Sequence, residues 1–232
     1  MNNWISYYND GVRLYGNEEY HSAIQAFNNS VTKLVESGGL KKKGKNEIDT
    51  YINMLILMGM SYRKTLDYKN SLGCFDSVRN ILEAKQKPTA ILPMVFNNIG
   101  EIYQEIDENT TALDFYLKAI EYADIYNIST PEVSVWELNA GNVNFILGKK
   151  IDSLNLLLKS EKHFNIFGPP KDSMFIFNLY SSISCVYYDD KEYELCRKYA
   201  SLAIESISSF DLNIDQDDLQ ELIQMYNDSI SI

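Results

Sequence analysis

The sequence has few of the residues that hold disulfide-linked or metal-bound proteins together. Among 232 residues there are 3 cysteines and 2 histidines, and no C-x-x-C motif occurs. Three cysteines without paired spacing do not form a disulfide framework. We therefore expect free thiols, a reducing cytoplasmic setting and no metal site.

Basic side chains are also in the minority, because 21 lysines and arginines stand against 32 aspartates and glutamates, a net charge of −11. Binding to phosphate backbones requires clustered lysine and arginine, so no nucleic-acid partner is expected. An acidic chain would speed its encounter with a basic partner. The same acidity would also keep a helical array in solution, and composition does not decide between these two interpretations.

Long apolar runs are absent as well. No stretch approaches the roughly 18 apolar residues of a membrane span, and the N-terminal segment lacks the basic and apolar regions of a secretory signal. No membrane partner is expected. The patterns G-x-x-x-x-G-K-[ST], HExxH, GxSxG, GxGxxG and that of EF-hands are missing too. We therefore expect a protein that is not an enzyme, with no catalytic residues and no cofactor.

The chain does contain a recurring helical pattern, which is clearest at residues 96–123. Large apolar residues at Phe96, Ile99 and Tyr103 follow a helical spacing. A polar cluster at 107–110 favours a turn. A second helical stripe follows, at Leu113, Tyr116, Leu117 and Ile120. Two such helices make an antiparallel hairpin with one apolar face still uncovered, so that face requires a neighbouring hairpin.

The same frame can be laid on the chain five times. In each copy a small residue of the first helix precedes a small residue of the second helix by twelve positions. The pairs are Gly11 and Ala23, Gly59 and Ser71, Gly100 and Ala112, Gly141 and Ser153, and Ser184 and Cys196. The fourth copy is the weakest, because Glu137 and Asn144 replace large apolar residues.

The third copy, Phe96-x2-Ile99-Gly100-x2-Tyr103 followed by Ala112-x3-Tyr116, resembles the tetratricopeptide repeat. Tetratricopeptide repeats usually have a period of about 34 residues. The period here is longer, since successive copies are 41 to 48 residues apart. In this the chain is similar to the long-period group that includes kinesin light chains, LGN-type adaptors and bacterial peptide-pheromone sensors. The resemblance implies an all-α, right-handed superhelix of stacked hairpins that binds peptides or partner proteins.

The resemblance, together with the turn and helix-end signals of the sequence, predicts one solenoid over residues 1–232. Its glycine- and lysine-rich segment 37–47 is expected to be a flexible loop. A role for this loop as a basic docking patch is the less favoured alternative. The predicted hairpins are 4–36, 48–86, 93–127, 131–167 and 172–210, followed by a capping helix at 215–228.

In the family the first helix of each hairpin lines the concave groove. Asparagine recurs on this stripe, although it is a mediocre helix former. An asparagine ladder, as in peptide-binding relatives, would match the N–H and C=O groups of an extended peptide. The resemblance thus predicts a groove of Asn53, Ile56, Met60, Asn97, Asn98, Glu101, Glu105, Leu138, Asn139, Asn142, Phe145, Asn178, Ser182 and Tyr188.

The chain is rich in asparagine throughout, so a compositional bias remains an alternative to the ladder. Glu101, Glu105 and Asp189 on the stripe suggest a ligand with basic side chains. The favoured function is a protein-interaction module that binds a peptide or partner protein in its groove. The alternatives are a peptide-responsive bacterial regulator acting by sequestration of a partner, and an acidic structural or toxin-neutralising subunit. The sequence does not indicate the oligomeric state.

Overall fold

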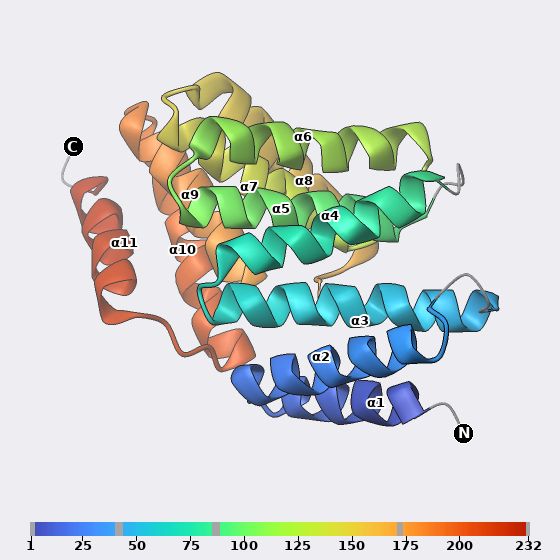
Figure 1. Cartoon of the computed structure of the whole chain (residues 1–232). Coiled ribbons are helices and arrows are strands. Elements are labelled where there is room, and N and C mark those ends of the chain that lie inside the picture. The colour runs from blue at the N-terminus through green and yellow to red at the C-terminus, as the bar shows by residue number, and fades with distance from the viewer. Residues whose placement is uncertain (1–2, 40–43, 85–88, 171–173, 231–232) are drawn as a thin grey trace. The chain divides into compact units, whose positions relative to one another are not determined.

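The computed structural model describes residues 3–39, 44–84, 89–170 and 174–230, and over these ranges it contains eleven α-helices and no strand (Figure 1). The middle of the predicted loop, residues 40–43, lies outside this part of the chain. The helices are α1 (Asn3–Gly16), α2 (Tyr20–Glu36), α3 (Lys45–Lys64), α4 (Tyr68–Ala84), α5 (Ile91–Glu105), α6 (Asn109–Ile125), α7 (Glu132–Ile146), α8 (Lys150–Phe167), α9 (Phe175–Asp189), α10 (Tyr193–Phe210) and α11 (Gln216–Asp228).

The helices follow one another as antiparallel pairs. In α1–α2, α3–α4, α7–α8 and α9–α10 the two helices of a hairpin contact each other. Three first helices also contact both helices of the hairpin before them: α3 contacts α1 and α2, α9 contacts α7 and α8, and α11 contacts α9 and α10. The chain forms two compact units, one ending at Ile102 and the other beginning at Tyr103, within α5. Helix α11 therefore packs on the fifth hairpin, α9–α10, as the first helix of a sixth hairpin would.

The small residues of the frame lie where two helices of a hairpin come closest. A Cβ atom on Gly11 would lie 2.4 Å from the ring of Phe27, and a Cβ atom on Gly141 would lie 2.8 Å from Leu157. Phe27 and Leu157 each stand sixteen residues after the glycine and are fully buried. Glycine at these positions therefore lets a large apolar side chain of the second helix lie against the backbone of the first.

The turns inside the hairpins are built alike in all five copies. In every copy the seventh residue after the small residue of the first helix has a positive φ, between 61° and 73°, and its N–H and the next N–H donate to carbonyls of the helix before it. This is the Schellman arrangement that ends helices. The residues with positive φ are Glu18, Leu66, Asp107, Gly148 and Lys191.

Leu66 is the least suited of these residues to its conformation. A left-handed backbone at a residue with a Cβ atom costs about 1–2 kcal/mol, and the exposed Leu66 side chain has little packing to offset that cost. We expect Leu66→Gly to raise the free energy of unfolding by about 1 kcal/mol in urea denaturation. The reverse change, Gly148→Ala, should lower it, and two changes of the same sign would contradict this explanation of the turns.

Several helix ends differ by a few residues from the predicted boundaries. Helix α3 begins at Lys45, inside the segment predicted as a loop, and Glu47 accepts a hydrogen bond from the N–H of Gly44 at 2.7 Å. Helix α5 begins at Ile91, so Pro93 lies in its first turn, where the missing N–H has no intrahelical partner to lose. Asp215 caps α11 by accepting from the N–H of Asp217 at 2.8 Å.

Candidate functional site

Two of the three asparagines predicted to line the groove in the first unit form hydrogen bonds within their own helix, α5. Asn98 is buried and donates from Nδ2 to the carbonyl of Met94 at 2.8 Å. Asn97 is also buried and donates to Glu101 at 2.9 Å. These amides already have partners within the helix, whereas Asn53 on α3 is exposed.

The apolar and acidic groove residues of this unit are also engaged. Ile56 is buried, and the sulfur of Met60 accepts a hydrogen bond from the hydroxyl of Tyr15 at 3.7 Å. Glu101 forms an ion pair with Arg63 of α3. Glu105 is exposed on the last turn of α5, in the part of that helix that belongs to the second unit. Glu101, predicted to recognise a basic ligand, is thus balanced by a cation of the protein.

Asp189 in the second unit is balanced in the same way. Lys150 of α8 forms ion pairs with Asp189 and, at 3.5 Å, with Asp190. Exposed ion pairs contribute little to stability, so the main effect of Lys150 is on the electrostatic potential around these two carboxylates. The negative charge at this end of α9 is reduced by the neighbouring cation.

Three of the predicted groove residues meet at one cavity in the second unit. Asn142 of α7 and Asn178 and Ser182 of α9 line a cavity of about 190 Å³, which Ser181 and Cys185 of α9 also line. Successive first helices therefore bring together polar residues that are up to 40 positions apart in the sequence. We call this space the α7/α9/α11 cavity.

The third wall of the α7/α9/α11 cavity was not predicted and comes from α11. Asp218 and Glu221 supply two carboxylates, while Leu222 and Met225 lie beside Phe177 of α9 as its apolar part. Leu222 is fully buried, and it belongs with Phe177 to the same core cluster. The apolar seam of α11 thus holds the helix in place and sets its acidic side chains at the cavity.

The polar side chains around the α7/α9/α11 cavity have no partners among the residues that the structure describes. Elsewhere in the chain, helical serines and asparagines often bond within the fold, as Ser160 does with the carbonyl of Ser134 at 2.7 Å. At the cavity, six polar side chains form neither a hydrogen bond nor an ion pair with any residue of those ranges. They are Asn142, Asn178, Ser181, Ser182, Asp218 and Glu221.

The thiol of Cys185, which lines the cavity, has low reactivity. Burial, and next the negative charge of Glu221, raise the pKa of Cys185 to about 11. A thiol with so high a pKa is protonated at neutral pH and is a poor nucleophile.

Four further predicted residues of this unit take structural positions. Leu138 is buried in the core cluster of α7, α8 and α9, and Phe145 packs against that cluster. Asn139 is half-buried on α7. Tyr188 donates from its hydroxyl to Asp228 of α11 at 2.9 Å. Tyr188 therefore ties α9 to α11, and Leu138 stabilises the packing of α7 against α8 and α9.

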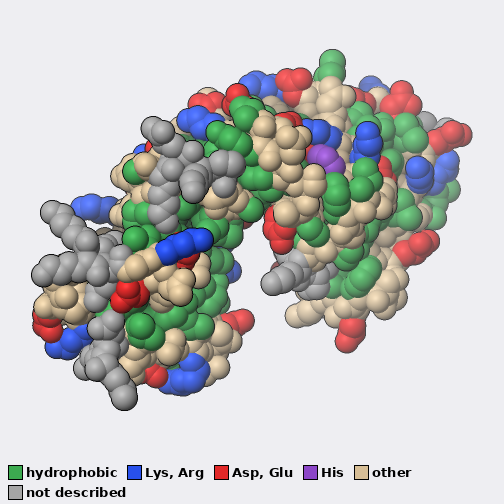
Figure 2. Space-filling model, turned by 90° about the vertical axis from the view of Figure 1, so that its right-hand side faces the viewer, with side chains coloured by type: hydrophobic (Ala, Val, Ile, Leu, Met, Phe, Trp, Pro, Cys, Tyr) green, Lys and Arg blue, Asp and Glu red, His purple; other side chains and the backbone are tan. Residues whose placement is uncertain are grey.

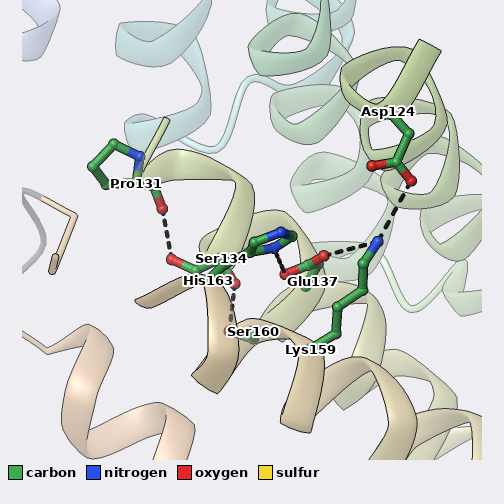
Figure 3. A network of polar contacts seen from close by, with 7 residues as sticks. All are labelled: Asp124, Pro131, Ser134, Glu137, Lys159, Ser160 and His163. Atoms are coloured by element: carbon green, nitrogen blue, oxygen red, sulfur yellow. Dashed lines mark hydrogen bonds and ion pairs between the residues drawn. The ribbon is translucent and has the colours of Figure 1, made fainter. Parts of the chain in front are cut away.

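A second polar cluster joins α7 to α8 (Figure 3). The carboxylate of Glu137 is fully buried, with Nδ1 of His163 at 2.6 Å and Nζ of Lys159 at 3.1 Å. Lys159 also reaches Asp124 of α6 at 3.4 Å. Burial raises the pKa of Glu137, while His163 and Lys159 act to lower it. The cluster explains how the fourth repeat accepts a carboxylate at an apolar position: its partners come from the second helix.

Some of what was missed had a signal in the sequence. Glu137 and His163 are 26 residues apart, the same separation as Trp4 and Ser30, where the Ser30 hydroxyl donates to the Trp4 carbonyl at 2.7 Å. That offset therefore marks a contact between the two helices of a hairpin. The position of Asp218 and Glu221 at the cavity has no comparable signal in the sequence, because the pattern at 215–228 predicts only a capping helix.

Three further features of the described residues bear on the kind of site. No group of three or more His, Cys, Asp or Glu side chains suited to a metal ion occurs in the described ranges. Among the helices of the same ranges, none combines the length and the apolar character needed to cross a bilayer. On the face shown in Figure 2, acidic and basic side chains are interspersed rather than gathered by sign.

The sequence matches no family model and no curated protein. Solved structures nevertheless share the fold. The apo form of RapI has a TM-score of 0.77 at 16% identity, covering 90% of this chain and 72% of that chain. A Rap protein complexed with competence and sporulation factor has a TM-score of 0.70 at 13% identity, covering 97% of this chain and 64% of that one. The TPR-like repeats of a putative kinesin light chain from Podosopora anserina give 0.66 at 9% identity, covering 91% and 98%.

Proposed function

We propose that this chain, which shares the fold of TPR-like solved structures, is a non-enzymatic interaction module. It would bind an extended peptide segment of a partner protein along the first helices α7 and α9 of the second unit. The segment would lie across the α7/α9/α11 cavity. The three cysteines are free, which supports a reducing, cytoplasmic setting.

The observation that carries this proposal is the set of unpartnered polar side chains on α7 and α9. A side-chain amide offers both donors and an acceptor, so Asn142 and Asn178 can each bond the N–H and C=O groups of an extended backbone. Ser182, four residues after Asn178 on α9, also lines the cavity and can donate or accept. The ladder of the prediction is thus proposed for the second unit, while Asn97 and Asn98 of the first unit are already bonded.

Two further considerations support a binding role. Among proteins of similar fold, a Rap protein has been solved in complex with competence and sporulation factor. The thiol of Cys185, the only cysteine at the cavity, is held protonated by burial, so it is a poor nucleophile. A regulator that acts by sequestering a partner would use the same surface and remains a form of this proposal.

The proposal is tested by selection from a displayed library of random peptides on immobilised protein. Each hydrogen bond contributes about 1 kcal/mol. Asn142→Ala/Asn178→Ala removes two hydrogen bonds at each position and should therefore weaken binding of the selected peptides by roughly 1,000-fold. The matched control is Asn155→Ala/Asn165→Ala, two exposed asparagines of α8 outside the cavity. Failure of the wild type to select any peptide, or equal loss in the control, would overturn the proposal.

A further inference from the structure

Helix α11 carries the two carboxylates of the α7/α9/α11 cavity, and they differ from the other acidic groups of the first-helix stripe. Glu101 is paired with Arg63, and Asp189 is paired with Lys150. Asp218 and Glu221 have no ion-pair partner among the described residues, and no lysine or arginine lines the cavity. The cavity therefore carries an uncompensated negative charge.

The size of the cavity limits what it can hold. Sites that enclose a small molecule have volumes of roughly 300–1,000 Å³, whereas this cavity has about 190 Å³. Such a space suits one long side chain better than a whole small molecule. It is also open on the side where a bound peptide segment would run, since Asn178 and Glu221 at its wall are exposed.

The chemistry of the walls is amphipathic. Phe177 and Met225 form a small apolar part of the wall, and the two carboxylates stand on the same helix as Met225. Lysine and arginine side chains have this same division, because their methylene stems lie along apolar surface while the charged head stays near water or an anion. A neutral or acidic side chain would leave both carboxylates without a partner and would add desolvation or repulsion.

We propose that the α7/α9/α11 cavity is a specificity site for one lysine or arginine side chain of the bound peptide, with Asp218 and Glu221 of α11 as its charged partners. This inference rests on the function proposed above and adds the class of side chain recognised. Helix α11 then supplies one wall of the binding site. The amides and hydroxyls of α7 and α9 would hold the peptide backbone beside it.

The test uses the full chain and the same displayed random-peptide library. Wild type should enrich peptides with a lysine or arginine at one position. Replacing that residue by a neutral isostere, citrulline for arginine or norleucine for lysine, should weaken binding about tenfold to a hundredfold. Asp218→Asn/Glu221→Gln should lose the same factor for the basic peptide but little for its neutral analogue.

A matched control separates the local effect from net charge. Glu194→Gln/Glu205→Gln removes two exposed carboxylates from the neighbouring helix α10 and should leave both affinities unchanged. Circular dichroism of each variant establishes that α11 and the array remain folded. Peptides selected without basic enrichment, or equal losses in the α10 control, would overturn this inference and leave the groove proposal standing. No selected peptide at all would overturn both.

Discussion

Leu157→Ala should lower the free energy of unfolding of the second unit by about 2–5 kcal/mol, the cost of truncating a fully buried leucine. Leu157 is wholly inaccessible in a cluster with Phe175, Leu179 and Ile183, and it lies against the backbone of α7 at Gly141. The shortened side chain would leave a void between α7, α8 and α9. These helices are fixed by several other large side chains, so they cannot close the gap fully.

Urea denaturation followed by circular dichroism measures this loss. The control is Ile151→Ala on the same helix, where the side chain is 79% exposed. That change should stay within about 0.5 kcal/mol. A loss below about 1 kcal/mol for Leu157→Ala would mean that α7 and α8 do not form the packed hairpin described above.

Gly11→Ala should destabilise the first unit by about 1–3 kcal/mol, the usual cost of overpacking. The new Cβ atom would lie 2.4, 2.6 and 2.9 Å from three carbons of the Phe27 ring. Phe27 is fully buried and planar, so the ring cannot turn aside without moving α1 or α2. The favourable helix propensity of alanine, up to about 1 kcal/mol over glycine, does not offset this contact.

The sign of the effect is the decisive measurement. Gly73→Ala on α4 meets no atom within 4 Å, so alanine should there stabilise by up to about 1 kcal/mol. Phe27→Leu should in turn reduce the additional cost of Gly11→Ala, because it removes the ring atoms that the Cβ atom meets. Two glycine variants that both stabilise would show that Gly11 is not a contact residue.

Much of the fold follows from the sequence because its determinants are local. The twelve-residue offset between small residues sets a helix, a turn and a helix, and similarity to TPR-like solved structures confirms the repeat prediction. The turn that repeats seven residues after each small residue needs no particular side chain, since Glu18, Leu66 and Asp107 all adopt it. For that reason the sequence predicts the repeat frame but not the turn residues that adopt a positive φ.

The candidate site was predictable only in part. Asn98 and Asn142 are both asparagines on the first-helix stripe, yet Asn98 is buried against the Met94 carbonyl while Asn142 faces a cavity without a described partner. Their difference depends on neighbouring helices rather than on the local pattern. Glu137 shows the same limit, because its buried carboxylate is explained only by His163 and Lys159 on α8.

The sequence by itself determined the repeat, its helical hairpins and the stripe of residues along the first helices, since helix periodicity and turn chemistry act within about twenty residues. The tertiary structure alone decided which polar groups on that stripe are satisfied. It paired Glu101 with Arg63, and it placed Asp218 and Glu221 of the presumed cap beside Asn142 and Asn178. The distances between successive first helices set these pairings, and no local pattern encodes such distances.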